Sequence, residues 1–397
     1  MRRTLWFAIG LVTLGAVAQV GTVQDLNWDC VKPAYVIAGD FNGDGFDDFA
    51  VACHSCNMIV IGLNPTDREC RKSCPVAWPA PKAFSLGDAP NALAWGLFGF
   101  GVGPYEKKIV AITQYTPAWT SFKVTDASAS LTTLPLITAV HVITGDFNGD
   151  GALDVAVLDP VGLSVHFISG RPGTSIASIN LRPHMIGGQP AFLAAADFDR
   201  DGDLDLVVSS GTSLHFFENT CSGKFAHKLE LPVAVSLRAI AVVDFDNDGR
   251  VDLAVVDPAF GGLVAIRNMG CWSFEVTARV KLDQEPVFVI PVDLNRDGRA
   301  DFAVAQYGGN VVSLVLNQGA GKFRLERSIP VGRDPISIAA GDFNRDGILD
   351  LVVALSGGGP NGVGPAIQVI YNPLCTPDDC TDVAPCCGST GTPPCAP

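Results

Sequence analysis

The stretch Asp342-Phe-Asn-Arg-Asp-Gly-Ile-Leu-Asp350 decides the fold of this chain, because it is one of six copies of a nine-residue acidic loop. The other copies occupy 40–48, 146–154, 197–205, 244–252 and 293–301. Every copy has Asp at position 1, Asp or Asn at 3, Asp at 5, Gly at 6 and Asp at 9. Oxygen ligands on alternate residues of a tight turn can converge on one hard cation such as calcium, which takes roughly 6–8 oxygens. The Gly supplies the backbone freedom that such a turn requires.

We therefore expect each loop to bind one calcium ion through the side chains at positions 1, 3, 5 and 9 and the backbone carbonyl at position 7. An arginine at position 7 is compatible with this role, because a carbonyl does not depend on its side chain. We expect about six structural ions per chain, since six copies in one register argue against a metal-free surface turn. The predicted ligands are Asp40, Asn42, Asp44, Phe46, Asp48, Asp146, Asn148, Asp150, Ala152, Asp154, Asp197, Asp199, Asp201, Asp203, Asp205, Asp244, Asp246, Asp248, Arg250, Asp252, Asp293, Asn295, Asp297, Arg299, Asp301, Asp342, Asn344, Asp346, Ile348 and Asp350.

The loop differs from an EF-hand, in which position 12 is a bidentate Glu and helices flank the loop. Here position 12 is Val in all six copies, as at Val353, and apolar residues run on both sides of the loop. Short apolar runs rich in β-branched residues are typical of buried strands. The repeating unit is therefore predicted to be a strand, an acidic turn and a second strand.

The spacing of the loops gives a unit of about 50 residues. Successive loops from 146 onward begin 47 to 51 residues apart, whereas the first two begin 106 apart. Pro90 starts a run like the one that precedes other loops, but Leu97, Gly99 and Gly101 replace the acidic residues. We predict that this second unit keeps its strands and has lost its cation. Lys107 and Lys108 follow, either to neutralise what remains of the site or as solvated side chains.

Seven such units, each with room for four short strands, predict an all-β, seven-bladed β-propeller. Towards the end of the chain we expect strands at about 324–331, 336–343, 349–355 and 367–371. The final unit then lacks an outer strand, which the segment 23–30 can supply. Such pairing would join the two ends of the chain and remove exposed strand edges, which favours a ring over an open solenoid.

The loops resemble FG-GAP/VCBS repeats, the blades of integrin α-subunit propellers and of many secreted bacterial proteins. The segments Gly39-Asp-Phe-Asn-Gly-Asp-Gly45 and Gly341-Asp-Phe-Asn-Arg-Asp-Gly347 carry the resemblance, which extends over about 22–373. It implies a propeller with calcium in its acidic loops and a binding face on the opposite side. The family includes adhesins, lectins, accessory domains and a few enzymes, so the resemblance does not select one function.

Composition indicates an exported protein. Residues 1–18 read as a signal peptide, with Arg2 and Arg3, an apolar run and a small-residue cleavage site, and 19–373 would form the propeller. The run is short for a membrane span. The net charge of −14 argues against a nucleic-acid partner. The loops cause much of this charge: four copies carry three carboxylates and two carry four at positions 1, 3, 5 and 9, which makes 20 of the 41 in the chain.

The twelve cysteines agree with an oxidising compartment. Four of them lie in the first unit and five in the Pro- and Cys-rich tail 374–397, which we expect to be a clasp or an attachment to a partner. Cys53 and Cys56 form a C-x-x-C motif that favours structural disulfides, with a metal site shared with Cys70 and Cys74, or redox chemistry, as alternatives. Cys221 and Cys271 occupy equivalent turns of adjacent units. The sequence does not define the pairing.

The sequence contains no G-x-S-x-G, H-E-x-x-H or phosphate-loop motif, so we predict no catalytic residues. The loops after the second strand of each unit form the candidate binding surface. They carry Tyr115, Trp119, Phe260 and Tyr307, which either bind a ligand or pack between blades. We favour a recognition or adhesion module for an extracellular glycan or protein. The alternatives are a secreted polysaccharide-active enzyme, or a structural component of a surface assembly that self-associates through the tail.

Overall fold

The computed structural model describes residues 22–64, 78–98, 106–113, 118–122, 129–133, 139–357 and 367–374, except positions 27, 29, 31, 87, 172, 185–187, 234, 235, 283 and 372. The predicted signal peptide and almost all of the tail lie outside these residues. The side chains of 118–122 and 129–133 are also not described. The strands pair into seven four-stranded antiparallel sheets, which we number as blades in chain order. The all-β propeller with four-stranded blades is confirmed.

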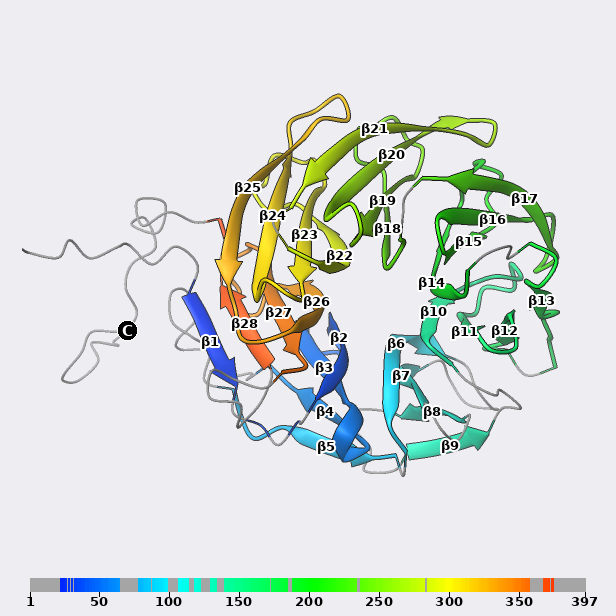
Figure 1. Ribbon diagram of the computed structural model, residues 1–397. Coiled ribbons are helices and arrows are strands. Elements are labelled where there is room, and N and C mark those ends of the chain that lie inside the picture. Colours follow the sequence, from blue (N-terminus) through cyan, green and yellow to red (C-terminus); the bar gives the residue numbers. More distant parts are fainter. Residues whose placement is uncertain are drawn as a thin grey trace, which may run out of the picture.

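The blades follow one another around a ring, with the first strand of each blade nearest the centre (Figure 1). Blade 1 consists of β2 (Pro33–Gly39), β3 (Asp48–Cys53), β4 (Met58–Gly62) and β5 (Lys82–Ser85). Blade 2 consists of β6 (Pro90–Phe98), β7 (Glu106–Thr113), β8 (Ala118–Phe122) and β9 (Ala129–Thr133). Blade 3 consists of β10 (His141–Gly145), β11 (Asp154–Asp159), β12 (Ser164–Ile168) and β13 (Ile179–Asn180). Blade 4 consists of β14 (Pro190–Ala196), β15 (Asp205–Ser210), β16 (Ser213–Asn219) and β17 (Phe225–Pro232).

The later blades repeat this order. Blade 5 consists of β18 (Ile240–Val243), β19 (Asp252–Asp257), β20 (Gly262–Gly270) and β21 (Ser273–Lys281). Blade 6 consists of β22 (Pro286–Val292), β23 (Asp301–Gln306), β24 (Val311–Asn317) and β25 (Phe323–Pro330). Blade 7 consists of β26 (Pro335–Gly341), β27 (Asp350–Leu355), β28 (Ile367–Tyr371) and, as its outer strand, β1 (Thr22–Leu26).

The ring closes as the sequence predicts. Strand β1 pairs antiparallel with β28, and Thr22 lies opposite Tyr371. Tyr371 also donates a hydrogen bond from its hydroxyl to the side chain of Gln24 at 2.7 Å. The last blade is thus completed by the beginning of the chain, and Figure 1 shows the two strands side by side.

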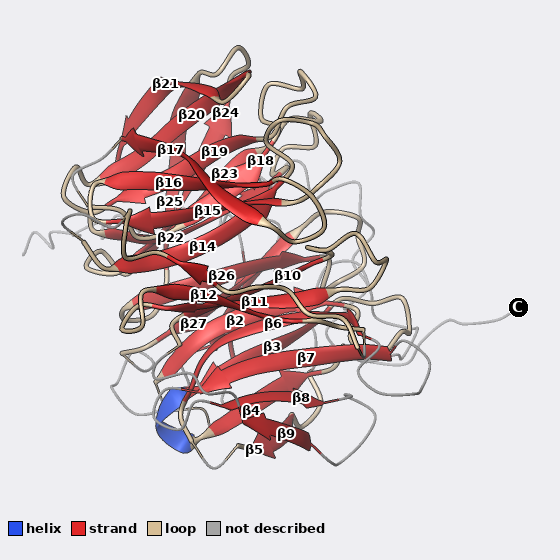
Figure 2. Ribbon diagram, turned by 90° about the vertical axis from the view of Figure 1, so that its right-hand side faces the viewer, coloured by secondary structure: helices blue, strands red, loops and turns tan. Residues whose placement is uncertain are grey.

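The core lies between blades. The second strand is buried at every residue in β3, β11, β15, β19, β23 and β27. Each of these strands is covered on both faces by neighbouring blades, which explains its continuous apolar sequence. Outer strands such as β25 instead alternate between exposed and half-buried residues over most of their length. Seen edge-on, the strands cross the thickness of the ring and the connecting loops gather at its two faces (Figure 2).

Two sequence expectations fall in blades 1 and 2. All four strands of blade 2 are present, and the segment 99–105, where its acidic loop would lie, is outside the described residues.

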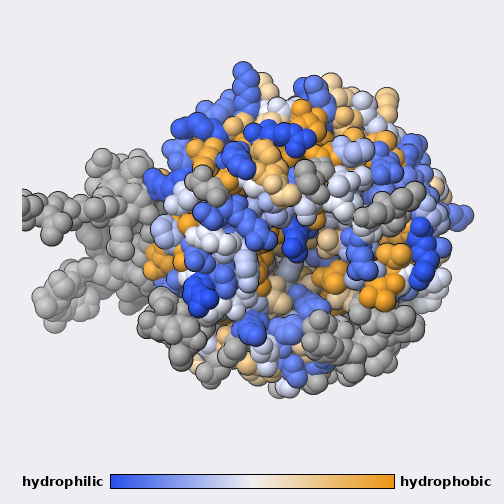
Figure 3. All heavy atoms as spheres, in the orientation of Figure 1, coloured by the Kyte–Doolittle hydropathy of each residue, from blue (hydrophilic) through white to orange (hydrophobic). Residues whose placement is uncertain are grey.

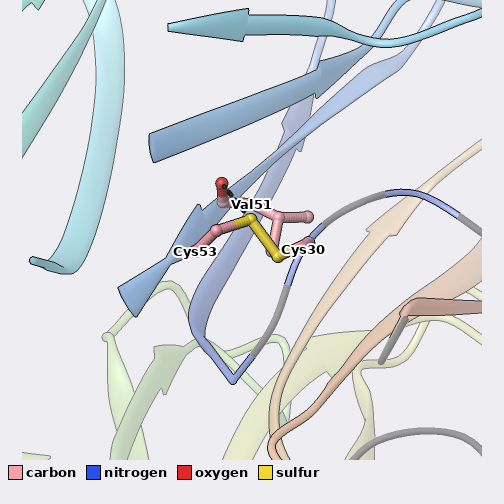
Figure 4. Close-up of a disulfide and its surroundings, with 3 residues drawn as sticks. All are labelled: Cys30, Val51 and Cys53. Carbon is pink, nitrogen blue, oxygen red and sulfur yellow. Dashed lines mark hydrogen bonds between the residues drawn. A yellow bond between two sulfur atoms is a disulfide. The ribbon is translucent and has the colours of Figure 1, made fainter. Parts of the chain in front are cut away.

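Cys53 forms a disulfide with Cys30, with an S–S distance of 1.99 Å, and this bond ties the entry of blade 1 to its second strand (Figure 4). Cys56 has no disulfide partner among the described residues. Cys221 and Cys271 are exposed, and neither is bonded to the other or to another cysteine in the described part of the chain.

Among the residues described, the one helix is the three-residue 3-10 turn η1 (His54–Cys56), and no helix has the length and apolar character needed to cross a membrane.

Candidate functional site: the acidic loops and the channel mouth

The acidic loops connect the first and second strands of six blades. The Asp at position 1 follows the first strand, and the Asp at position 9 begins the second. In loop 197–205, Asp197 accepts hydrogen bonds from the backbone amides of Arg200, Asp201 and Gly202 at 2.6–3.2 Å, which closes the turn. Gly202 has φ +96°, so the Gly predicted from the sequence is required by the backbone. Position 4 also has positive φ, as at Arg200 with φ +69°.

The Asp at position 9 is the most buried carboxylate of each loop. All six of these residues are 0% exposed, and one carboxylate oxygen of each accepts the backbone amide of position 2 at 3.0–3.1 Å. In blade 4 the other oxygen of Asp205 accepts the amide of Asn219 at 2.8 Å. Burial raises the pKa of Asp48, Asp205 and Asp252 to about 7, against the opposing effect of these amide bonds, and neighbouring carboxylates raise it further.

The residues of the loops fit a hard cation. In loop 197–205, carboxylate oxygens of Asp197, Asp199 and Asp205 lie within 4.8 Å of one another, and Asp244, Asp246 and Asp252 repeat this arrangement. An all-oxygen, carboxylate-rich set is the donor chemistry that calcium prefers. A divalent cation would also relieve the repulsion between neighbouring carboxylates, which adds to the effect of burial on the pKa of the position-9 carboxyl groups.

Cationic side chains from elsewhere in the chain contact several of the acidic loops. In loop 146–154, Arg171 donates from Nη1 to the carbonyl oxygen of Asp150 at 3.2 Å. Lys107 of β7 reaches loop 40–48, where its Nζ lies 2.7 Å from the Asp40 carbonyl oxygen and 3.0 Å from its Oδ2. Lys107 therefore neutralises the acidic loop of the neighbouring blade 1, and not a remnant of the acidic loop of its own blade. Arg267 of β20 places Nε 2.6 Å from Asp246 Oδ2 and Nη2 3.1 Å from Asp248 Oδ2.

A recurring asparagine, to which the sequence analysis assigns no role, joins adjacent loops. Asn219 ends β16, is 1% exposed, and donates from Nδ2 to the carbonyl of Phe147 in blade 3 at 2.9 Å and of Leu204 in its own loop at 3.2 Å. The equivalent residues, which we call clamp asparagines together with Asn219, are Asn64, Asn268 and Asn317. In blade 3, Gly170 takes this place. The signal for the clamp is an Asn that recurs 14 to 16 residues after position 9.

The opposite end of the central channel holds a cavity. Apart from Tyr307, which follows β23, its lining residues lie near the starts of the first strands, whereas the acidic loops follow the ends of the same strands. The cavity has a volume of about 450 Å³, and each of the seven blades contributes to it. The polar residues at its wall include Asn91, Arg238, Glu285 and Tyr307. The face of the ring seen in Figure 3 is largely polar, with apolar residues scattered over it.

Aromatic rings form the floor of this cavity. Tyr35 donates or accepts a hydrogen bond with His141 Nε2 at 3.2 Å, and its ring meets Phe288 edge-on at 5.5 Å. His141 packs on Phe192 with ring centroids 3.8 Å apart. These side chains come from blades 1, 3, 4 and 6 and meet across the channel. Burial lowers the pKa of His141 to about 3, so the ring is neutral.

The structure separates the four aromatic residues that the sequence placed on the binding surface. Tyr307 is 38% exposed and lines the cavity. Phe260 lies in the turn after β19, with the cationic groups of Lys281 and Arg279 at 5.0 and 6.0 Å from its ring centre. Trp119 belongs to β8 rather than to a loop, which corrects that prediction, because the strand pairs with β7 as far as Ile112. Tyr115 lies outside the described residues.

The histidines form no ring of ligands around the channel. His141 and His215 are buried at 5% and 2% exposure, and His166 is half-buried on β12, as expected for packed or surface residues. His184 and His227 stack with ring centroids 4.0 Å apart between blades 3 and 4. Among the described residues, groups of three or more His, Cys, Asp or Glu side chains that converge within 4.8 Å contain only aspartates.

Comparisons with known proteins agree with this geometry. A family model of an FG-GAP-like repeat matches residues 146–208, 197–255 and 293–353. No curated protein matches the chain. Similar solved structures include BBS1N in complex with ARL6DN, with 12% identity, a TM-score of 0.59 and coverage of 90% of this chain and 99% of that one. A streptogramin B lyase has 15% identity and a TM-score of 0.58, with coverage of 88% of this chain and 97% of that one. U3-55K has 10% identity and a TM-score of 0.58, with coverage of 88% of this chain and 98% of that one.

At these identities the solved structures share the fold alone. The fold and the repeated loops define a β-propeller whose blades carry acidic turns of one consensus. The chain is a β-propeller that carries FG-GAP-like repeats, and this fold supports a protein-interaction module in general.

Proposed function

We propose that this protein is a secreted, calcium-stabilised recognition module that binds an extracellular protein or glycan at the channel mouth. The single observation that carries the proposal is the cavity of about 450 Å³ to which every blade contributes. A site built from all blades has fixed geometry, because the closed ring holds its walls in place. FG-GAP repeats are also typical of extracellular proteins.

The chemistry of the mouth supports a polar ligand with an apolar face. Arg238 and Glu285 are exposed, and both also border a neighbouring hollow of about 600 Å³ that includes Lys281 and Gln284. Tyr307 adds an exposed ring that can stack on a sugar face or fill a protein interface. The presence of both charges favours a ligand with hydrogen-bonding groups over a purely apolar one.

Calcium has a supporting role in this proposal. The residues that would hold it are those at positions 1, 3, 5, 7 and 9 of the acidic loops, at the face of the ring opposite the cavity. Bound calcium would supply positive charge to carboxylates that otherwise repel one another. Since the metal binds the native state preferentially, it stabilises the fold. It would thus act on ligand binding through the stability of the blades.

The test is a glycan and matrix-protein binding array with protein that begins at Gln19, run in calcium and again after EDTA treatment. A specific hit that is lost in Arg238→Ala or Tyr307→Ala, and kept in the outer-strand variant Arg324→Ala, supports the channel mouth as the site. A hit that all three variants retain would place recognition elsewhere. Absence of binding by folded, calcium-loaded protein would count against the recognition module.

A further inference from the structure

The six acidic loops share one consensus, but their surroundings differ in charge. Loop 40–48 receives Lys107, whose ammonium group is held between the side chain and the carbonyl oxygen of Asp40. Lys107 lies on β7 of blade 2, the blade that has no acidic loop of this consensus. Loop 40–48 therefore receives a cation from the blade in which the acidic consensus is lost.

Loop 244–252 receives Arg267 in a similar way. The guanidinium bridges Asp246 and Asp248 at 2.6 and 3.1 Å, and the Asp246 side chain is only 7% exposed. Arg250 at position 7 also contacts Asp248. This in-loop contact is not specific to the loop, because Arg299 makes the same contact with Asp297 in loop 293–301. The bridge made by Arg267 is what distinguishes loop 244–252.

Arg267 occupies a position of the blade that varies in charge. It directly precedes the clamp asparagine Asn268, and the corresponding residues are Glu218 in blade 4 and Leu316 in blade 6. In blade 4 the Glu218 carboxylate adds negative charge beside Asp199, although Lys228 pairs with it at 2.8 Å. Within the described part of blade 4, no ion pair reaches Asp197, Asp199 or Asp205.

Loops 197–205 and 244–252 are therefore a natural matched pair. Both bring three carboxylates within 4.8 Å of one another, and both have Asp at positions 1, 3, 5 and 9. They differ in the sign of the charge that the third strand places next to them. A divalent cation entering loop 244–252 must displace Arg267 or share carboxylates with it, whereas loop 197–205 presents its carboxylates without such a competitor.

We propose that Lys107 and Arg267 are built-in cations that take the place of a metal ion in loops 40–48 and 244–252. The inference rests on the calcium binding proposed above and deepens it, because it sets two loops whose carboxylates pair with a cation from another strand apart from loop 197–205, whose carboxylates do not. Loop 197–205 is the strongest metal site. Loops 40–48 and 244–252 bind calcium at least about tenfold more weakly, as expected when a unit positive charge remains within a few ångströms of the ion.

The experiment measures calcium stoichiometry and affinity by isothermal titration of the EDTA-treated and dialysed full propeller. Arg267→Leu installs the residue that blade 6 has, and Lys107→Met removes the charge but keeps an unbranched chain. Arg324→Leu is the matched control, because it removes one positive charge from an outer strand where Arg324 pairs with Glu326. The number of ions in the tight class of the wild type is the reference. Each loop variant should add one ion, and the control should leave the count unchanged.

A second measurement separates the proposal from damage to the fold. In EDTA, Arg267→Leu should lower the melting temperature, because the loop loses its cation, whereas the increase in melting temperature caused by calcium should be larger than in the wild type. A variant that is merely destabilised would lose stability in both conditions without a larger calcium effect, which would overturn the proposal.

A terbium probe reports on the strongest site by itself. The Trp272 indole lies beside Asp199, so Tb³⁺ in loop 197–205 should give tryptophan-sensitised luminescence that Trp272→Phe abolishes. Calcium should displace this ion at lower concentration than it fills the remaining sites. Six equivalent calcium sites in the wild type, or no gain of an ion in either loop variant, would refute the built-in cations alone. Absence of calcium binding by the wild type and by both variants would refute the proposed calcium binding itself.

Discussion

The substitution Asn219→Ala tests whether the clamp asparagines hold neighbouring blades together. In the folded protein the Asn219 side chain donates to the carbonyls of Phe147 and Leu204 and accepts the amide of Gly223 at 3.0 Å. The first of these bonds joins blade 4 to the acidic loop of blade 3. Alanine removes all three bonds and leaves three backbone groups without these partners at a site where the wild-type side chain is 1% exposed.

The magnitude follows from the cost of unpaired buried polar groups. Each such group costs about 1–3 kcal/mol, and carbonyls fall towards the lower end because they have a second lone pair. Three groups give a loss of about 3 kcal/mol in the free energy of unfolding, if each costs about 1 kcal/mol. Asn219→Asp should be at least as damaging, since it keeps the acceptor for Gly223 but sets a carboxylate against two carbonyl oxygens.

The assay is urea unfolding in saturating calcium, followed by intrinsic fluorescence and by circular dichroism. The control is Asn180→Ala, the same substitution at an exposed asparagine that accepts one amide from Arg182 at 3.1 Å, and it should change the free energy of unfolding by about 0.5 kcal/mol or less. A loss below about 1 kcal/mol for Asn219→Ala would refute the clamp.

Three further predictions concern pH and the disulfide. The pKa values of Asp48, Asp205 and Asp252 are raised to about 7 in the metal-free fold, so the native state binds more protons than the unfolded chain between pH 5 and pH 7. EDTA-treated protein should therefore be more stable at pH 5 than at pH 8. Thermal unfolding across this range checks the prediction, and equal stability or the opposite trend would contradict it. The buried His141 has the opposite effect: with its pKa lowered to about 3, the unfolded chain binds the extra proton, so its contribution to stability is present above about pH 6.5 and is lost as the pH falls towards 3. His141→Gln should remove this acid-side loss, and a pH profile identical to that of the wild type would argue against it. Replacing both Cys30 and Cys53 by Ser removes a disulfide with a sequence separation of 23 and should lower the free energy of unfolding by about 3 kcal/mol. Urea unfolding measures this loss, with Cys221→Ser as the control. Equal stability of the two variants would show that the disulfide constrains the unfolded chain little.

Local chemistry allowed much of this fold to be predicted from the sequence. The acidic loop encodes its own turn, because the Asp at position 1 accepts amides only three to five residues away, as Asp197 does from Arg200 to Gly202. The apolar runs after position 9 predict strands buried on both faces, and β27 is buried at every residue. The missing outer strand of the last unit led directly to β1, because an unpaired strand edge must find a partner.

Contacts between blades could not be read in this way. The bond from Lys107 to Asp40 joins residues 67 apart, and the one from Asn317 to Phe245 joins residues 72 apart. Which side chains meet over such separations depends on strand register and on the angle between neighbouring blades. The sequence analysis left the role of Lys107 open. Arg267 carried no local signal, because it lies on β20 whereas its carboxylate partners lie in the acidic loop that precedes β19.

The sequence by itself determined the repeat, the four-stranded units, the positions of the acidic turns and the closure of the ring, since each depends on residues that are close in the chain or on a simple count of strands. Only the tertiary structure decided the partner of Cys53, the cavity at the channel mouth and the loops that receive a cation from the protein itself. The physical reason is that the burial, the charge and the side-chain contacts at these sites arise only when blades lie side by side. A repeated sequence pattern does not specify which residues of the adjacent blade surround each copy.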